Sequence, residues 1–218
     1  DHSFLRLGSD YLDLYLIHRF DYNIPIEETM DALNDLVKSG KVRSLGSSSI
    51  LAYQMLMYQN LAKEKGYARF EVMENHYNLL YREEERGMIP LCKELDVSLI
   101  PYSPLAAGHL ARINWDSDSI RSLSDDVAKR RYGASEDVDK LIVERVAELA
   151  KKRNIKMSEV ALSWLYKKGV ASPIIGASKT KYIDDAINAL DIELNDEEVA
   201  YLEELYVPHP LKGPIIKN

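Results

Sequence analysis

The sequence predicts an α/β fold of the (β/α)8 barrel type. Short apolar runs alternate with stretches of helical periodicity, and the first four runs begin near residues 11, 42, 70 and 97. An interval of about 30 residues is what a parallel strand and its crossover helix require. Polar residues able to do chemistry follow every run, as they do in a barrel whose active site is built from the loops after its strands.

Five segments are expected to form the strands. Each is a nearly continuous apolar run, which is typical of a parallel sheet whose two faces are both covered. They are YLDLYLI at 11–17, VRSLG at 42–46, FEVME at 70–74, VSLIPYS at 97–103 and SPIIGAS at 172–178.

Helices are expected between and after these strands. Apolar residues recur at helical spacing from Ile26 to Val37, within a segment bounded by a proline and a glycine that are typical helix boundaries. Asn195 and Glu198 have the spacing of a capping box at the start of the last helix. The expected helices lie at about 25–40, 52–65, 83–94, 137–153, 158–168, 180–189 and 194–206. The polar stretch near 106–136 lacks periodicity and is expected to be a functional or mobile loop.

A doubly wound sheet would show the same alternation of strands and helices. No Gly-x-Gly-x-x-Gly follows any of the expected strands, which disfavours the dinucleotide-binding version of that fold. Five strands do not close an eight-stranded barrel, so three further units of about 30 residues each are needed. We therefore expect a single barrel domain over residues 1–218, with its first three βα units absent.

Composition disfavours several classes of function. The 218 residues carry a formal net charge of −7, which argues against nucleic acids or anionic membranes as partners. No apolar run approaches the roughly 20 residues of a membrane-spanning helix, and the first residues contain no signal-peptide pattern. Cys92 is the only cysteine, so no disulfide can form within the chain. We expect a soluble, cytoplasmic protein.

Five motifs resemble the aldo-keto reductase family, in family order and at family spacings. They are LGSDYLDLYLIHRFD, GKVRSLGSSSI, ENHYNLLYREEERGMIPLC, IPYSPLAAGHLA and SPIIGASKTKYIDDAINAL. The third and fourth are most similar to a branch that includes fungal aryl-alcohol dehydrogenase-like members. The resemblance covers about residues 5–208. It implies hydride transfer between NADP(H) and a small carbonyl or alcohol substrate, which in that branch is expected to be aromatic.

The resemblance assigns one residue to catalysis. In the family a tyrosine donates the proton, a lysine and an aspartate tune it, and a histidine orients the carbonyl. The histidine corresponds to His18, whose imidazole could donate to the carbonyl oxygen as charge develops there. The other three come from the first three strands, so this chain is expected to lack them. From spacing alone, a structural role for His18 at the end of a strand is an open alternative.

The resemblance assigns the nicotinamide of the cofactor to Ser48, Ser49, Glu74 and Tyr102. The family usually has Asn at the position of Ser49 and Gln at that of Glu74. An ionised Glu can accept a hydrogen bond from the carboxamide NH2 but cannot donate one. Tyr102 would stack on the nicotinamide ring. The alternatives are a helix cap for Ser49 and a place in the barrel wall for Tyr102.

The resemblance assigns the rest of the cofactor to two later segments. The pyrophosphate corresponds to Ser103, Pro104, Leu105 and Gly108, and the adenosine 2′-phosphate to Gly176, Ser178, Lys179, Tyr182 and Asp185. A hydroxyl and an ammonium near a helix start suit a phosphate. The family commonly has Arg or Gln where Tyr182 stands and Asn where Ala186 stands, which weakens the preference for NADP over NAD.

Three functions stay open on these grounds. The first is an NADP-dependent reductase or alcohol dehydrogenase, and the second is a catalytically inactive remnant or nucleotide-binding module. The third is a metal-dependent hydrolase barrel using His18, Asp21 and His76, although no His-x-x-x-His spacing supports a metal site.

The long loop and the sheet edges suggest further partners. In the loop, Trp115 and Tyr132 could wall the substrate site, and Lys129, Arg130 and Arg131 could contact phosphate. The unpaired edges of an incomplete barrel predict self-association.

Overall fold

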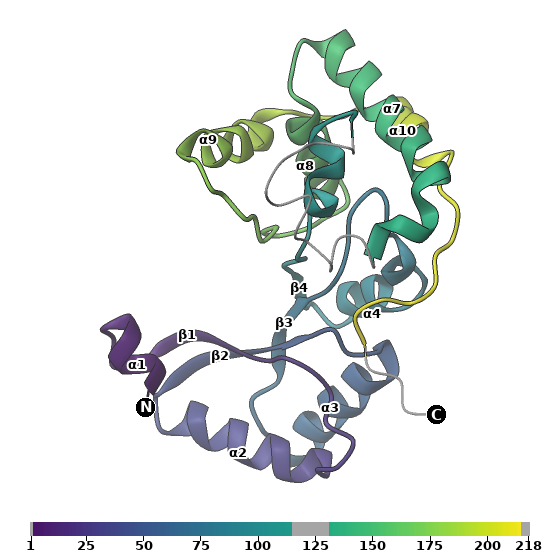
Figure 1. Ribbon diagram of the computed structural model, residues 1–218. Coiled ribbons are helices and arrows are strands. Elements are labelled where there is room, and N and C mark those ends of the chain that lie inside the picture. The colour runs from purple at the N-terminus through teal and green to yellow at the C-terminus, as the bar shows by residue number, and fades with distance from the viewer. Residues whose placement is uncertain (1, 115–130, 215–218) are drawn as a thin grey trace. The chain divides into compact units, whose positions relative to one another are not determined.

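The computed structural model describes residues 2–114 and 131–214 (Figure 1). The chain separates into two compact units. Unit 1 consists of the described residues of 1–75, 85–99 and 213–218, and unit 2 consists of those of 76–84 and 100–212. Each unit has buried apolar residues of its own. The expectation of a single domain stays a prediction.

Unit 1 alternates strands and helices, as its sequence pattern predicts. Its strands form one parallel sheet in the order β1-β2-β3-β4. A doubly wound sheet reverses its strand order at a switch point, whereas these four strands follow the order of the chain, as in a barrel. The elements are α1 (His2–Leu7), β1 (Leu12–Ile17), α2 (Ile26–Lys38), β2 (Val42–Ser48), α3 (Ala52–Lys65), β3 (Phe70–Glu74), α4 (Met88–Glu94) and β4 (Ser98–Leu99).

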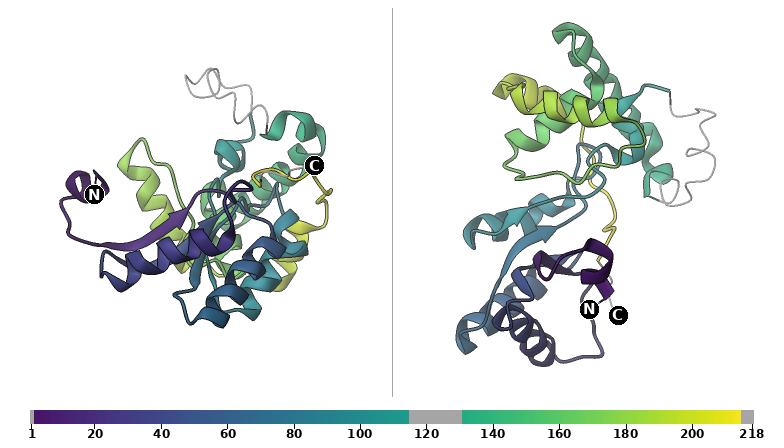
Figure 2. Two further views of the ribbon diagram at one scale, coloured as in Figure 1. Left: turned by 90° about the horizontal axis from the view of Figure 1, so that it is seen from below. Right: turned by 90° about the vertical axis from the view of Figure 1, so that its left-hand side faces the viewer.

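The helices α2 and α3 cover one side of this sheet. Figures 1 and 2 show them side by side beneath β1 and β2. Met30 of α2, Tyr58 of α3 and Phe70 of β3 are all buried. The rings of Tyr58 and Phe70 meet edge to face, with centroids 5.3 Å apart, an arrangement that aromatic rings prefer. The apolar stripes of the two helices therefore form the core of unit 1 with the strands.

Gly46 allows a close approach between neighbouring strands of the sheet. A Cβ atom at this position would lie 2.9 Å from the carbonyl oxygen of Val72 and 3.1 Å from the Leu16 side chain. The register between β2 and β3 shifts at this point, between Leu45 and Gly46. The strands on both sides of β2 thus require a residue without a side chain here.

Unit 2 is built from helices and short 3-10 turns. They are η2 (Ala106–Ala111), η3 (Gly133–Ser135), α7 (Glu136–Arg153), α8 (Met157–Lys167), α9 (Thr180–Asn188), η4 (Ala189–Asp191) and α10 (Asp196–Glu203). The predicted capping box is confirmed at α10, where Asn195 Oδ1 accepts from the Glu198 N–H at 2.8 Å. None of the helices in the two described ranges combines the length and apolarity needed to cross a membrane.

Two of the expected strands are wrong in extent. The segment 97–103 keeps only Ser98–Leu99 as a strand. The segment 172–178 forms no strand; Ile174 makes an isolated parallel bridge to Tyr102 and donates its N–H to the Pro101 carbonyl at 2.9 Å. Prolines at 101 and 173 explain both errors, because a proline has no N–H to donate to a sheet ladder.

The expected helix at 83–94 is also divided. A 3-10 turn, η1 (Glu83–Arg86), precedes α4, and Gly87 between them has φ −156° and ψ −57°. These angles are not helical, so the 3-10 turn and α4 are separate elements. The expected loop at 106–136 contains η2 and η3 at its two ends, and the remainder at 115–130 lies outside the described residues.

Candidate functional site

In unit 1, the residues assigned to catalysis and to nicotinamide lie at the carboxyl ends of neighbouring strands. His18 directly follows β1, Ser48 ends β2, and Glu74 ends β3. Ser48 and Glu74 are paired in register, and the Ser49 N–H donates to the Glu74 carbonyl at 3.0 Å. The parallel sheet therefore brings these four residues to one edge.

Two buried side chains at this edge have polar atoms that no described residue pairs with. Ser48 Oγ and both side-chain polar atoms of Asn75 are buried and have no hydrogen-bond partner among the residues that the structure describes. Unsatisfied buried groups are costly in a folded protein and are often explained by a ligand or a water molecule. Asn75, which sequence reasoning did not assign to the cofactor, is an amide with a free donor and a free acceptor.

The environment of Glu74 changes what its carboxyl group can do. Burial raises the pKa of Glu74, while the neighbouring His18 and Arg19 oppose that shift. A protonated carboxyl group donates one hydrogen bond and accepts others. Only the protonated form of Glu74 could donate to a carboxamide as the Gln usual in the family does.

Unit 2 contains a cavity of about 720 Å³. Eight of the thirteen residues assigned to the cofactor line it, namely Ser103, Pro104, Leu105, Gly108, Gly176, Ser178, Tyr182 and Asp185. The lining comes from the segment that contains η2, from the start of α8, and from the segment that leads into α9. Two stretches more than 60 residues apart in the sequence thus share one cavity, as a single extended ligand requires.

The backbone along one side of the cavity is strained. Ser103, Ala106 and Ala107 have positive φ values of 55°, 48° and 58°, and Gly108 follows at 98°. Residues with a Cβ seldom adopt this left-handed region, and such strain persists at ligand-binding positions more often than elsewhere. Gly108 is the one of the four that adopts it without a steric penalty.

Three cationic side chains line the cavity. Arg131 Nη1 donates to Ser103 Oγ at 3.3 Å, and its guanidinium lies 5.0 Å from the centroid of the Tyr102 ring. Arg112 Nε is buried, with no partner among the described residues. Lys156 forms an ion pair with Asp185. Only Arg131 was a candidate phosphate contact on sequence grounds, because Arg112 and Lys156 carry no periodic or motif signal.

A buried polar cluster supports the cavity wall at Tyr132. The Tyr132 hydroxyl lies 2.8 Å from His76 Nε2 and accepts from Asn78 Nδ2 at 3.1 Å. Asn78 also donates to the Ser103 carbonyl at 2.9 Å. Burial lowers the pKa of His76 to about 3, so its imidazole is neutral at physiological pH. On sequence grounds, His76 was a candidate only as a metal ligand and Tyr132 only as part of a substrate wall.

The remaining predicted residues are placed as follows. Tyr102 stacks on His76 with centroids 5.3 Å apart, and Lys179 is exposed immediately before α9; neither belongs to the cavity lining. Their cofactor roles stay predictions. Trp115, Lys129 and Arg130 lie outside the described residues. Within the described part of the chain, no group of three or more His, Cys, Asp or Glu side chains could hold a metal ion.

The sequence is similar to known proteins over almost its whole length. The profile of the aldo/keto reductase family matches residues 1–207. An aldo-keto reductase of Fusarium vanettenii is 52% identical over 212 residues, which are 97% of this chain and 57% of that protein. A Schizosaccharomyces pombe protein, named provisionally as an aryl-alcohol dehydrogenase, is 46% identical over 215 residues, with 98% and 60% of the two chains covered.

A third relative has a named substrate. The versiconal hemiacetal acetate reductase of Aspergillus parasiticus is 44% identical over 214 residues, which are 96% of this chain and 62% of that protein. The chain thus spans about three fifths of the length of the curated relatives it matches. Since the family profile covers residues 1–207 of 218, the chain belongs to the aldo/keto reductase family.

Proposed function

We propose that this chain supplies the NADP(H)-binding part of an oxidoreductase that interconverts aldehydes or ketones and alcohols. The observation that carries the proposal is the cavity of unit 2, in which eight residues from two distant segments come together. Members of this family are generally NAD(P)H-dependent. A cavity of about 720 Å³ lies within the range that holds cofactor-sized ligands.

The two sides of the cavity suit the two phosphate-bearing parts of the cofactor. Near Gly108, the guanidinium groups of Arg112 and Arg131 can bind the pyrophosphate oxygens. On the other side, Ser178 and Lys156 can bind the phosphate of the adenosine ribose. A Cβ at Gly176 would meet nothing within 4 Å, so the packing of the protein leaves space there for a ligand.

The strand ends of unit 1 suit the nicotinamide and the carbonyl substrate. Ser48, Asn75 and Glu74 offer the donors and acceptors that a carboxamide needs. His18 would donate to the carbonyl oxygen and stabilise the charge that forms there. NADP(H), when bound, supplies or accepts the hydride. In the family that the chain resembles, the proton-donating tyrosine and its lysine and aspartate come from the first three strands.

The names of the relatives suggest the class of substrate. One is named as an aryl-alcohol dehydrogenase and another as a reductase of versiconal hemiacetal acetate. We therefore favour aromatic aldehydes and alcohols as substrates. A cytoplasmic location is proposed on a separate ground, because a single cysteine, Cys92, is typical of a reducing compartment. Self-association is proposed through β1, which lies at the end of the described sheet and pairs there only with β2.

A second candidate is a nucleotide-binding module without turnover. All residues that line the cavity belong to unit 2, so nucleotide binding does not require the strand ends of unit 1. The two candidates differ in one measurement, because only the first predicts carbonyl reduction by the longer protein.

Binding is tested by titrating the chain with NADPH and following its fluorescence. We expect saturable binding, which Gly176→Val should weaken about tenfold or more, because the added methyl groups would enter the cavity. Ala177→Val is the matched control, since Ala177 neighbours Gly176 but does not line the cavity. No binding by the parent chain, or equal weakening by both variants, would contradict the proposal.

Turnover is tested in the longer protein with an aryl aldehyde. His18→Ala should lower kcat about 10²-fold or more, because the developing oxyanion loses a hydrogen-bond donor. NADPH affinity should stay unchanged in the same variant. Unchanged turnover would instead favour the structural alternative for His18, and absent turnover in the parent would favour the binding module.

A further inference from the structure

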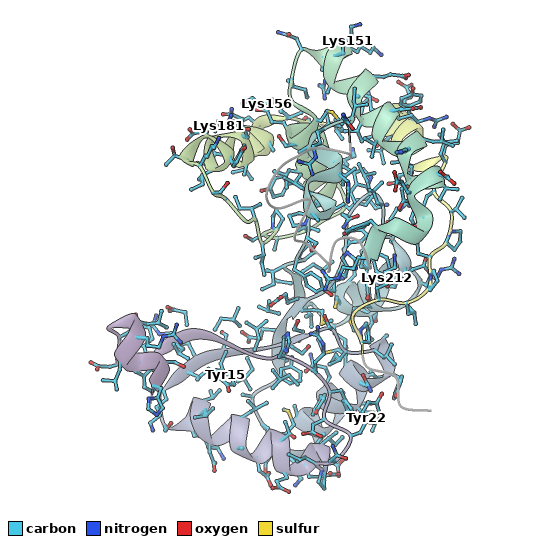
Figure 3. All side chains as sticks on the ribbon, in the orientation of Figure 1. Tyr15, Tyr22, Lys151, Lys156, Lys181 and Lys212 are labelled. Atoms are coloured by element: carbon cyan, nitrogen blue, oxygen red, sulfur yellow. The ribbon has the colours of Figure 1, made fainter. Side chains whose placement is uncertain are left out.

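The ammonium of Lys156 lies between two carboxylates at the adenosine end of the cavity. It forms an ion pair with Asp185 of α9 and lies 4.0 Å from Glu159 Oε1 of α8. Figure 3 shows Lys156 beside α9. Lys156 and Asp185 both line the cavity. The motif assigned Asp185 to the cofactor, whereas Lys156 stands 29 residues earlier and was not a candidate.

The two partners of this ion pair differ in solvent exposure. The Asp185 side chain is 11% exposed, whereas that of Lys156 is 57% exposed. Asp185 raises the pKa of Lys156, which therefore stays charged at physiological pH. Lysine carries its charge on a flexible stem of four carbons, so the ammonium can change partners without moving the backbone.

The carboxylate of Asp185 favours a ribose with a free 2′-hydroxyl, whereas the ammonium of Lys156 favours a ribose with a 2′-phosphate. A carboxylate accepts a hydrogen bond from a ribose hydroxyl, which is how acidic residues select NAD in dinucleotide-binding folds. The same carboxylate repels a phosphate, which instead needs a cation. Asp185 lines this part of the cavity and Glu159 lies 4.0 Å from Lys156, so these carboxylates would repel a phosphate unless Lys156 neutralised them.

We propose that Lys156 is a mobile counterion that, together with Asp185, determines whether a ribose 2′-phosphate or a 2′-hydroxyl is preferred. Without the phosphate the ammonium neutralises Asp185, and with the phosphate it turns to the ligand. A 2′-hydroxyl donates to Asp185 and leaves the ion pair in place. The inference rests on the proposed function and adds a specificity residue to it.

The experiment measures calorimetric affinities for two probes that differ only at the ribose, 2′,5′-ADP and 5′-ADP. Lys156→Met should weaken 2′,5′-ADP about ten- to a hundredfold, the range expected for a lost charge-assisted hydrogen bond, and change 5′-ADP less than about twofold. Lys156→Arg should restore most of the affinity for 2′,5′-ADP. The loss in Lys156→Met should shrink at high salt, because Lys156 is largely exposed.

Two further variants make the test specific. Asp185→Asn should strengthen 2′,5′-ADP relative to 5′-ADP, because it removes the competing carboxylate. Lys181→Met is the matched control: Lys181 also lies on α9, but its ammonium lies 5.3 Å from the Tyr182 ring centroid and it does not line the cavity. It should change both affinities less than about threefold, the small effect expected of an exposed charge.

Several results would overturn the inference. Equal weakening of both probes by Lys156→Met would show a structural tether between α8 and α9, and weaker 2′,5′-ADP binding by Asp185→Asn would show that the carboxylate only positions the lysine. Equal affinity of the parent for both probes would end the inference while leaving nucleotide binding intact. Binding of neither probe by the parent would end the proposed function together with it.

Discussion

The contacts within unit 1 and the contacts within unit 2 join residues that differ greatly in their separation along the chain. In unit 1, Gln59 pairs with the backbone of Phe70, 11 residues away, and Arg43 pairs with Asp13, 30 residues away. In unit 2, the Arg82–Glu203 ion pair at 2.7 Å joins residues 121 positions apart. Unit 1 is therefore stabilised by contacts between successive βα neighbours. Unit 2 instead requires the segment around Glu203 to pack against the first residues of that unit, near Arg82.

The returning segment of unit 2 is held by buried polar groups. The Tyr206 hydroxyl and the His209 N–H both donate to Glu83 Oε1, at 2.8 and 2.9 Å. The His209 ring lies 3.0 Å from Asp139, and both side chains are almost fully buried. Buried polar groups stabilise only when they are paired. Unit 2 is thus expected to lose more stability than unit 1 when a single partner is removed.

The largest effect is expected from Trp164, which is fully buried in unit 2. Its indole N–H donates to Glu203 Oε1 at 2.8 Å, and the centroids of its ring and of the Tyr77 ring are 5.1 Å apart. Trp164→Ala should lower the free energy of unfolding by about 3–5 kcal/mol, through lost contacts and a cavity. Urea denaturation measures this loss, and amide exchange should show it in α8 before β2. Equal loss of protection in α8 and β2 would contradict the contrast between the units.

The next largest effect concerns the pH dependence of unit 2. Burial, and then the charge of Glu83, raises the pKa of Glu84 to about 7 from its ordinary value of 4.5. The folded state then binds more protons than the unfolded state between these pH values, so this group makes stability fall as pH rises from 4.5 to 7. Glu84→Gln should remove that slope and be the more stable form at pH 8, by up to about 3 kcal/mol.

His76 contributes to the pH dependence in the opposite direction. Because His76 is present in both proteins, the difference between Glu84→Gln and the parent isolates the contribution of Glu84. A neutral buried His76, with a pKa of about 3, makes stability fall as pH decreases below its ordinary value of 6.5. Chemical denaturation at a series of pH values measures both proteins. Parallel stability curves for the two would show that Glu84 does not titrate in this window.

A smaller effect is expected in unit 1, at Gly46. Gly46→Ala would place a Cβ 2.9 Å from the Val72 carbonyl oxygen. The strands must separate to relieve this contact, at a cost of about 1–3 kcal/mol. Gly133→Ala is the matched control, because a Cβ there meets nothing within 4 Å. Thermal unfolding that is equally affected by both variants would mean that the sheet does not need a glycine at 46.

The smallest effect is expected from a contact that is local in sequence although it lies in unit 2. Asn195→Ala removes the acceptor of the Glu198 N–H and should cost about 1 kcal/mol. Asn195→Ser should keep most of the stability, because a serine hydroxyl also caps a helix. If Asn195→Ala costs as much as Trp164→Ala, then the span of a contact does not explain the difference between the units.

The candidate site was partly predictable for a physical reason. Carboxyl ends of parallel strands meet at one edge, so the positions of His18, Ser48 and Glu74 after successive apolar runs were enough to group them. The family motifs led to the segments on both sides of the cavity. Arg112 and Lys156 were missed because a single charged residue at a helix start or in a loop looks like an ordinary exposed side chain.

Local sequence by itself determined the alternation of strands and helices, the extent of α3 at 52–65, the capping box at Asn195 and membership of the family. These features depend on periodicity, on caps and on motifs within a few residues. Tertiary structure alone decided that Ile174 forms its bridge with Tyr102, that Arg82 pairs with Glu203 and that Lys156 faces Asp185. The physical reason is that such pairings depend on how separate elements pack. The periodicity within one element does not indicate which other element it packs against.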